Sequence, residues 1–233
     1  MYTEDSFKKG DQLLMLEMNN AFNISILASG STGNSLYLES PQKRILVDAG
    51  LSGKKITSLL AEVDRKPEDL DAILVSEGPG SYTGLRIAAS GVKGLLFEND
   101  VPLYGVNTLA SFAISAARNH QTSTAIHSVI DARRKHLYYQ RFMFDEQLNP
   151  ETEVKTIPIG QFEETVEESD IIVGTGLNRI DEKVRDKAVI FGKDYITAKS
   201  LIDFYHSGEN DFVNEVKPEQ FEPKYYTSNQ ISA

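Results

Sequence analysis

The chain has 233 residues, of which 40% are hydrophobic, and its 34 acidic against 24 basic residues give a formal net charge of −10. This length and composition support a real core in one large domain or two small lobes, whereas the acidic balance argues against a dedicated nucleic-acid surface. The chain has no cysteine, which excludes disulfide scaffolds and thiolate metal sites.

Residues 1–22 are expected to lie outside the fold, as an arm or a short helix. They do not read as a signal peptide, because the apolar run Leu13–Leu16 is short and Glu17 interrupts it. No apolar run in the chain approaches the length of a membrane span. We therefore expect a cytoplasmic protein with no membrane partner.

The first third predicts three short strands, at 23–28, 35–39 and 43–48. The glycine-containing loop at 30–35 is interpreted as a hairpin turn, because it has no lysine after its last glycine and leads into another strand. Ser52 is then expected to cap a helix at 53–63, whose apolar residues follow an i, i+3, i+4, i+7 pattern. A buried strand is predicted at 72–76.

A nine-residue motif, GPGSYTGLR at 78–86, joins this strand to a helix predicted at 83–97 with Ser81 as its N-cap. One stripe of the helix is apolar and is expected to pack on a sheet. A second stripe, nearly without side chains, consists of Gly84, Ala88, Gly91 and Leu95. Since each glycine inside a helix costs about 1 kcal/mol against alanine, we expect another backbone to approach this stripe closely.

The second half predicts two paired strands, at 123–130 and 136–144, around a connection at 131–135. That connection contains the densest basic run of the chain, Arg133-Arg134-Lys135, which an acidic tract at 163–168 offsets. A helix at 161–168, a buried strand at 171–173 and a late helix at 199–205 complete the expected elements.

The ionisable residues predict no self-sufficient active site. The four histidines, at 120, 127, 136 and 206, follow no metal-ligand pattern. Asp48 and Asp131 each end an apolar run, where catalytic carboxylates and capping residues both occur, and an ion pair of Asp131 with Arg133 is worth only about 0–1 kcal/mol if exposed. An anion at the N-terminus of the 83–97 helix is less favoured than a capped turn. We therefore predict no catalytic residue and no metal site.

The motif GPGSYTGLR resembles the hallmark of the TsaB family, a bacterial subunit of the machinery that makes threonylcarbamoyladenosine in tRNA. Three further segments agree in order, namely VPLYGVNTL at 101–109, IDARR at 130–134 with Tyr138, and FEPKY at 221–225. The resemblance covers residues 68–226, about two thirds of the chain.

Residues 24–76 resemble a different family, the start of a metallo-β-lactamase-fold hydrolase of the YycJ type. In that family the last strand runs into Thr-His-x-His-x-Asp-His, which supplies the metal ligands. The matching positions here, 76–82, read Ser-Glu-Gly-Pro-Gly-Ser-Tyr, so those ligands are absent. The chain reads as a mosaic with a seam at 71–76, and both families supply the order strand-strand-strand-helix-strand-helix with which an actin-like lobe begins.

The TsaB resemblance implies an α/β fold of two actin-like (ASKHA) lobes, each a mixed sheet with helices. We divide the chain into an N-terminal arm at 1–22, an N-terminal lobe at 23–107 and a C-terminal lobe at 108–233. The resemblance further implies a non-catalytic subunit that binds TsaD and supports threonylcarbamoyl transfer to N6 of the adenosine beside the tRNA anticodon. A TsaE-like ATPase is an additional partner and a homodimer an alternative one.

By the same resemblance, two helices of the N-terminal lobe form the partner interface, from the residues Thr83, Gly84, Arg86, Ile87, Ala88, Gly91, Leu95, Lys54, Lys55 and Ser58. No cofactor is expected on this chain alone, because ATP and a metal would be held by partner subunits, and tRNA is expected to bind only through the complex. The alternatives are a metallo-β-lactamase-fold hydrolase, disfavoured by its missing ligands, and a peptidase, for which no nucleophile or metal pair is visible.

Overall fold

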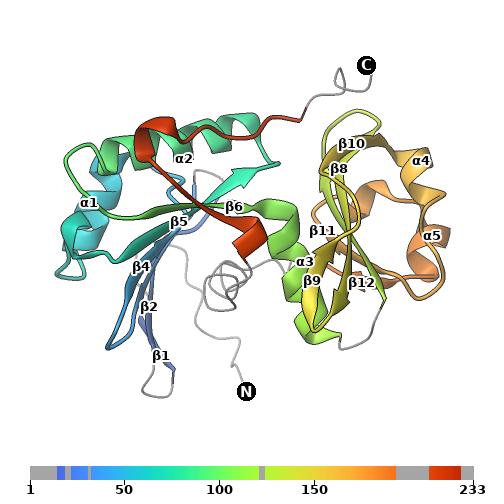
Figure 1. The fold of residues 1–233 in the computed structure, drawn as a ribbon, viewed down its shortest axis with the longest axis horizontal. Coiled ribbons are helices and arrows are strands. Elements are labelled where there is room, and N and C mark those ends of the chain that lie inside the picture. Colours follow the sequence, from blue (N-terminus) through green and yellow to red (C-terminus); the bar gives the residue numbers. More distant parts are fainter. Residues whose placement is uncertain (1–14, 19–21, 31–32, 121–123, 193–209, 227–233) are drawn as a thin grey trace.

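The computed structural model describes residues 15–18, 22–30, 33–120, 124–192 and 210–226, which form a mixed α/β fold around two sheets (Figure 1). The first sheet has seven strands in the order β1-β2-β3-β4-β5-β6-β13. Their bounds are β1 Met15–Met18, β2 Phe22–Ala28, β3 Ser35–Glu39, β4 Arg44–Val47, β5 Ala72–Gly78, β6 Leu103–Asn107 and β13 Val213–Val216.

The second sheet has six strands, in the order β10-β8-β7-β11-β12 with β9 paired to β8. Their bounds are β7 Ala125–Asp131, β8 His136–Asp145, β9 Gln147–Pro150, β10 Lys155–Pro158, β11 Ile171–Gly174 and β12 Val189–Phe191. The described helices are α1 Gly53–Ala61, α2 Tyr82–Leu95, α3 Thr108–Asn119, α4 Ile159–Glu163 and α5 Glu182–Asp186, with 3-10 turns η1 Pro67–Asp69, η2 Leu177–Arg179, η4 Asn210–Phe212 and η5 Pro218–Gln220.

The helices divide the interior into packed layers. α1 and α2 cover one face of the first sheet, where Ile56, Leu60 and Val92 pack against alternate strand residues such as Ile73. α3 lies between the two sheets, since its buried side chains join residues from both into one cluster. The strand β5 is buried on both faces and pairs in parallel with β4 and β6, as its continuous apolar run predicts.

Each sheet contains a meander of three antiparallel strands followed by a strand that pairs in parallel. The two sheets differ in which strand of the meander makes that parallel pair. In the second sheet the first strand, β7, pairs in parallel with β11. In the first sheet the third strand of the β2-β3-β4 meander, β4, pairs in parallel with β5. The order of elements along the chain is therefore as expected, but the first lobe does not repeat the strand order of the second.

Most of the expected elements are present, with shifted ends. The hairpin around residues 30–35 and the capped helices are confirmed, and Ser52 and Ser81 both accept a backbone hydrogen bond as N-caps. The helix expected at 161–168 spans only Ile159–Glu163. The helix expected at 199–205 lies outside the described residues.

Two segments pair with the first sheet although the expected domain limits place them outside the N-terminal lobe. Residues 1–22 do not lie wholly outside the fold, because Met15–Met18 pair with β2 as an antiparallel strand. The chain also returns to the first sheet late, since β13 pairs with β6 although it belongs to the expected C-terminal lobe. Both segments satisfy backbone hydrogen-bonding groups at a sheet edge that would otherwise be open.

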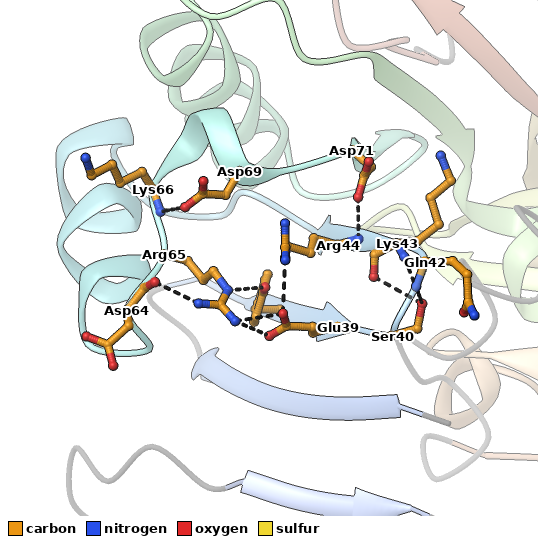
Figure 2. A network of polar contacts seen from close by, with 11 residues as sticks. Glu39, Ser40, Gln42, Lys43, Arg44, Asp64, Arg65, Lys66, Asp69 and Asp71 are labelled. Atoms are coloured by element: carbon orange, nitrogen blue, oxygen red, sulfur yellow. Dashed lines mark hydrogen bonds and ion pairs between the residues drawn. The ribbon is translucent and has the colours of Figure 1, made fainter. Parts of the chain in front are cut away.

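A charged network ties the first meander to the loop after α1 (Figure 2). Both oxygens of Glu39 accept hydrogen bonds from Nη2 of Arg65, at 2.7 and 3.0 Å, and Arg44 Nε donates to the same carboxylate at 3.1 Å. Arg65 Nε also donates to the hydroxyl of Tyr37 at 3.3 Å. Burial opposes ionisation of Glu39, but these hydrogen bonds outweigh it and lower its pKa below the ordinary value.

Replacing Arg65 with methionine is expected to lower the free energy of unfolding by about 1 kcal/mol, because it removes the paired hydrogen bonds to Glu39. Arg44→Met is the matched control and should cost less, since the Arg44 side chain is 43% exposed against 29% for Arg65. Urea denaturation measures both. Equal losses would show that the two arginines contribute alike.

Candidate docking site

The N-terminus of α2 is built by the GPGSYTGLR motif. β5 ends at Gly78, which has φ +112°, a conformation that side-chain-bearing residues rarely adopt. Ser81 then caps the helix, its Oγ accepting from the backbone N–H of Gly84 at 3.4 Å. The turn thereby brings Tyr82 to the surface at the first position of α2.

The FEPKY segment lies directly against this turn. The backbone N–H of Lys224 donates to the carbonyl of Glu77 at 2.7 Å, and Lys224 Nζ pairs with the buried carboxylate of Glu77 at 2.7 Å. A Cβ on Gly78 would lie 2.7 Å from the carbonyl oxygen of Lys224, so this contact needs glycine. The ring of Tyr225 lies 5.0 Å from that of Tyr82. Two motifs far apart in sequence therefore meet at one place.

The outer surface of α2 carries large side chains that remain exposed. Tyr82 is 59% exposed, Ile87 40% and Phe97, just after the helix, 84%. Arg86 lies over the ring of Tyr82, with Cζ 5.3 Å from the centroid, and its Nη1 donates to the Tyr82 hydroxyl at 2.8 Å. Exposed aromatic and arginine side chains of this kind are enriched at the centres of protein interfaces.

Beside these side chains runs a groove of about 540 Å³ between the start of α1 and α2. It is lined by Ser52, Gly53, Tyr82, Thr83, Arg86, Ile87, Ser90 and Gly91. We call these residues other than the buried Gly91, together with Phe97 and Tyr225, the docking face. The face combines the large side chains of Tyr82, Arg86 and Ile87 with the hydroxyls of Ser52, Thr83 and Ser90, a mixture that suits a protein partner.

Seven of the residues predicted from sequence for the partner interface are exposed, namely Lys54, Lys55, Ser58, Thr83, Gly84, Arg86 and Ile87. The groove brings Thr83, Arg86 and Ile87 together. Their role in binding a partner stays a prediction.

The prediction is wrong for the other three residues, Ala88, Gly91 and Leu95, which are buried inside the chain. A Cβ on Gly91 would lie 2.3 Å from the carbonyl oxygen of Leu51, and one on Gly53 would lie 2.9 Å from the backbone nitrogen of Leu95. The small residues therefore admit the backbone at the start of α1, not that of another protein.

The interface residues predicted from sequence omit six members of this face, namely Ser52, Gly53, Tyr82, Ser90, Phe97 and Tyr225. The spacing of Tyr82, Arg86 and Ser90 at intervals of four marks one exposed stripe, so periodicity alone was sufficient to find it. Tyr225 gave no such signal, because its contact with Tyr82 depends on the course of the chain after β13.

Asp131 and Asp48, which each end an apolar run, both accept a hydrogen bond from a nearby backbone N–H. Asp131 does not form an ion pair with Arg133, as had been considered, but accepts its backbone N–H at 2.8 Å and pairs with Arg179 Nη1 at 3.1 Å. Asp48 lies at the end of β4 with φ 63°, and burial raises its pKa.

His127 is fully buried between Asp170, 2.9 Å from Nε2, and Tyr139, 3.1 Å from Nδ1. Burial lowers the pKa of His127 although Asp170 opposes the shift. The trio therefore links β7 to β8 and to the residue before β11, with the imidazole closed off from solvent.

Within the described part of the chain, no group of three or more His, Asp or Glu residues is placed to hold a metal ion. Among the same residues, no helix is both long and apolar enough to cross a lipid bilayer.

Residues 49–209, which carry α1, α2, the strands β5 and β6 of the first sheet and the whole second sheet, match a known family model. That model is TsaD, tRNA N6-adenosine threonylcarbamoyltransferase, and it covers more than half of the chain. The tRNA threonylcarbamoyladenosine biosynthesis protein TsaB of Bacillus subtilis (strain 168) is 30% identical over 149 residues, which cover 64% of this chain and 57% of that protein. The chain belongs to the TsaB/YeaZ family, within the wider family of the TsaD model.

A solved TsaB/YeaZ structure has the same fold. YeaZ from Pseudomonas aeruginosa aligns with a TM-score of 0.57 at 22% sequence identity, covering 83% of this chain and 94% of that one. This likeness agrees with a TsaB/YeaZ architecture of two mixed sheets with helices.

The chain is also similar to the exodeoxyribonuclease WalJ of Streptococcus pneumoniae serotype 2 (strain D39), at 43% identity over 123 residues that cover 50% of this chain and 38% of WalJ. The chain thus carries sequence similar to two families, and its matches span less than two thirds of the length of either curated relative.

Proposed function

We propose that this chain is a non-catalytic subunit of a tRNA threonylcarbamoyladenosine synthesis complex and binds a TsaD-like partner through the docking face. Support comes from membership of the TsaB/YeaZ family. The observation that carries the proposal is that the family's two motifs together build the exposed cluster of Tyr82, Arg86 and Tyr225. A partner that covers these side chains would explain why aromatic residues are exposed here.

In this proposal the chain supports threonylcarbamoyl transfer to N6 of the adenosine beside the tRNA anticodon, in the cytoplasm. ATP and a metal belong to partner subunits, among them a TsaE-like ATPase, and tRNA is reached through the complex. A homodimer through the same face is the competing use of this surface, because one face cannot hold two partners at once.

The test compares two isoleucines of similar exposure. Ile87→Asp on the docking face is expected to weaken binding of TsaD at least tenfold, about 1.4 kcal/mol, because it places a charge in a desolvated contact. Ile190→Asp is the control, since Ile190 is 37% exposed on β12 of the second sheet. Calorimetric titration with purified TsaD measures both.

Arg86→Glu should weaken the same binding, and stimulation of tRNA modification by TsaD should fall in parallel. Equal effects of Ile87→Asp and Ile190→Asp, or none, would reject the docking face. Self-association that Ile87→Asp abolishes, with no TsaD binding by the unchanged chain, would favour the homodimer.

In the hydrolase alternative, metal ligands would lie at residues 77, 79, 81 and 82. Three of these positions have other contacts in this structure. Glu77 pairs with Lys224, Ser81 caps α2, and Tyr82 contacts Tyr225. Each of these positions is thus committed to the turn or to the docking face. Stoichiometric zinc or manganese in the purified protein would overturn our preference.

A further inference from the structure

The connection between β7 and β8 is a turn held in one shape from both sides. The carboxylate of Asp131 accepts the backbone N–H of Arg133 at 2.8 Å and pairs with Arg179 Nη1 at 3.1 and 3.2 Å. Nη2 of Arg179 donates to the carbonyl of Arg134. The turn closes where His136 N–H donates to the carbonyl of Arg133 at 3.2 Å.

The residues at the top of this turn are not the ones that its backbone favours. Arg133 has φ 70° and Arg134 has φ 51°, so two consecutive arginines lie in the left-handed region. Glycine and asparagine adopt this region most readily, and they dominate turns of this kind. Two consecutive arginines thus occupy a backbone conformation that favours other residues. This indicates a requirement for the arginine side chains that the fold alone does not explain.

What the two arginines and Lys135 share is an unpaired positive charge. All three are exposed, and within the described residues none of their side chains makes a hydrogen bond or an ion pair. This is notable in a chain of formal net charge −10, whose cations have many acidic side chains to pair with. Adjacent arginines on a fixed turn suit phosphate groups, which guanidinium binds through paired hydrogen bonds.

The turn is linked to the docking face through a series of contacts between neighbouring segments. The carbonyl of Lys135 accepts the N–H of Ile159, just after β10, while Thr156 of β10 donates to the carbonyl of Tyr226 at 3.3 Å. Tyr226 follows Tyr225, whose ring contacts Tyr82. Figure 1 shows the start of β8, the end of β10 and α2 in the upper part of the view. A partner on the docking face would therefore lie on the same side of the molecule as the turn.

We infer that Arg133, Arg134 and Lys135 contact the phosphate backbone of the RNA that the partner subunit holds. The inference rests on the proposed function, because three cations are too few to bind RNA tightly alone and need the partner to bring it close. The chain without its partner should accordingly show no nanomolar binding of tRNA in a gel shift at physiological salt.

The test replaces these side chains with residues that the turn prefers, in the variant Arg133→Asn, Arg134→Gly, Lys135→Gln. With the reconstituted complex, the KM for tRNA should rise about tenfold, and the dependence of log affinity on log salt should lose a slope of about 2 to 3. The melting temperature of the variant should rise, since the left-handed backbone is relieved. A role in folding alone predicts the opposite change in melting temperature.

The control neutralises three exposed lysines that are not part of the turn, Lys43→Gln, Lys66→Gln and Lys183→Gln, and so changes the net charge equally. It should leave the KM for tRNA unchanged. An unchanged KM and salt dependence for the turn variant, or an equal effect of the control, would overturn the inference. Weaker assembly with TsaD at an unchanged KM would also overturn it and assign the turn to an acidic protein surface.

Assembly is measured first, with the unchanged chain, to separate the two proposals. If the unchanged chain does not assemble with TsaD, the proposed function fails and this inference with it. If it assembles and stimulates modification but the turn variant does the same at an equal KM, only this inference fails.

Discussion

Replacing Gly91 with alanine is expected to lower the free energy of unfolding by about 1–3 kcal/mol, although alanine is the better helix former. The added Cβ would lie 2.3 Å from the carbonyl oxygen of Leu51 and 3.0 Å from that of Ala49. Both atoms belong to the backbone between β4 and α1, which cannot move without disturbing Asp48 and Ser52. Urea denaturation of the unchanged chain and of the Gly91→Ala variant measures the loss. Gly91→Leu should lower the free energy of unfolding further.

Gly94, one turn later on α2, provides the matched control. A Cβ there meets no atom within 4 Å, so Gly94→Ala should raise the free energy of unfolding by up to about 1 kcal/mol. Opposite signs at the two glycines would confirm that only Gly91 is needed for close approach inside the chain. A stable Gly91→Ala protein that loses only partner binding would restore Gly91 to the docking face.

The sequence was sufficient to find the stripes of α2 but not to tell which one faces outward. Ala88 and Val92 lie on neighbouring stripes, and both are buried, because α2 packs on the sheet below and on α1 beside it. A helix buried on two sides has a wider apolar face than one that lies on a sheet alone. The position of Gly53 against Gly91 and Leu95, which decides the matter, is a tertiary contact.

Contacts between distant segments were beyond reach for the same reason. Glu77 and Lys224 are 147 residues apart, and Asp131 and Arg179 are 48 apart, so no local pattern links either pair. By contrast, β5 could be predicted, because a continuous apolar run is the local signature of a strand flanked by parallel neighbours. The order of strands in space follows from neither propensity nor periodicity.

That strand order determines where α1 lies. In the first sheet α1 connects β4 to β5, which are adjacent and parallel, so the helix crosses back beside α2. In the second sheet the equivalent connection runs from β10 to β11, which β8 and β7 separate. A first lobe with the order of the second would therefore place α1 at a different distance from α2 and change the groove between them.

Replacing residues 24–76 with the corresponding segment of a TsaB is expected to strengthen pairing with TsaD at least tenfold, about 1.4 kcal/mol. The present segment resembles the YycJ type, sets the position of α1 and exposes Lys54 and Lys55 beside the groove. Unmatched lysines at a desolvated contact weaken binding, and a misplaced helix reduces the area that a partner covers. Calorimetric titration with TsaD compares the two chains.

Adding Ile87→Asp to the replaced chain serves as the control and should abolish the gain, because it places a charge on α2 in the same face. Circular dichroism melting should show that both chains remain folded. If the replacement gives no gain while Ile87→Asp still weakens binding, α2 sets the partner and α1 has no part in docking. If neither change matters, the partner binds elsewhere on the molecule.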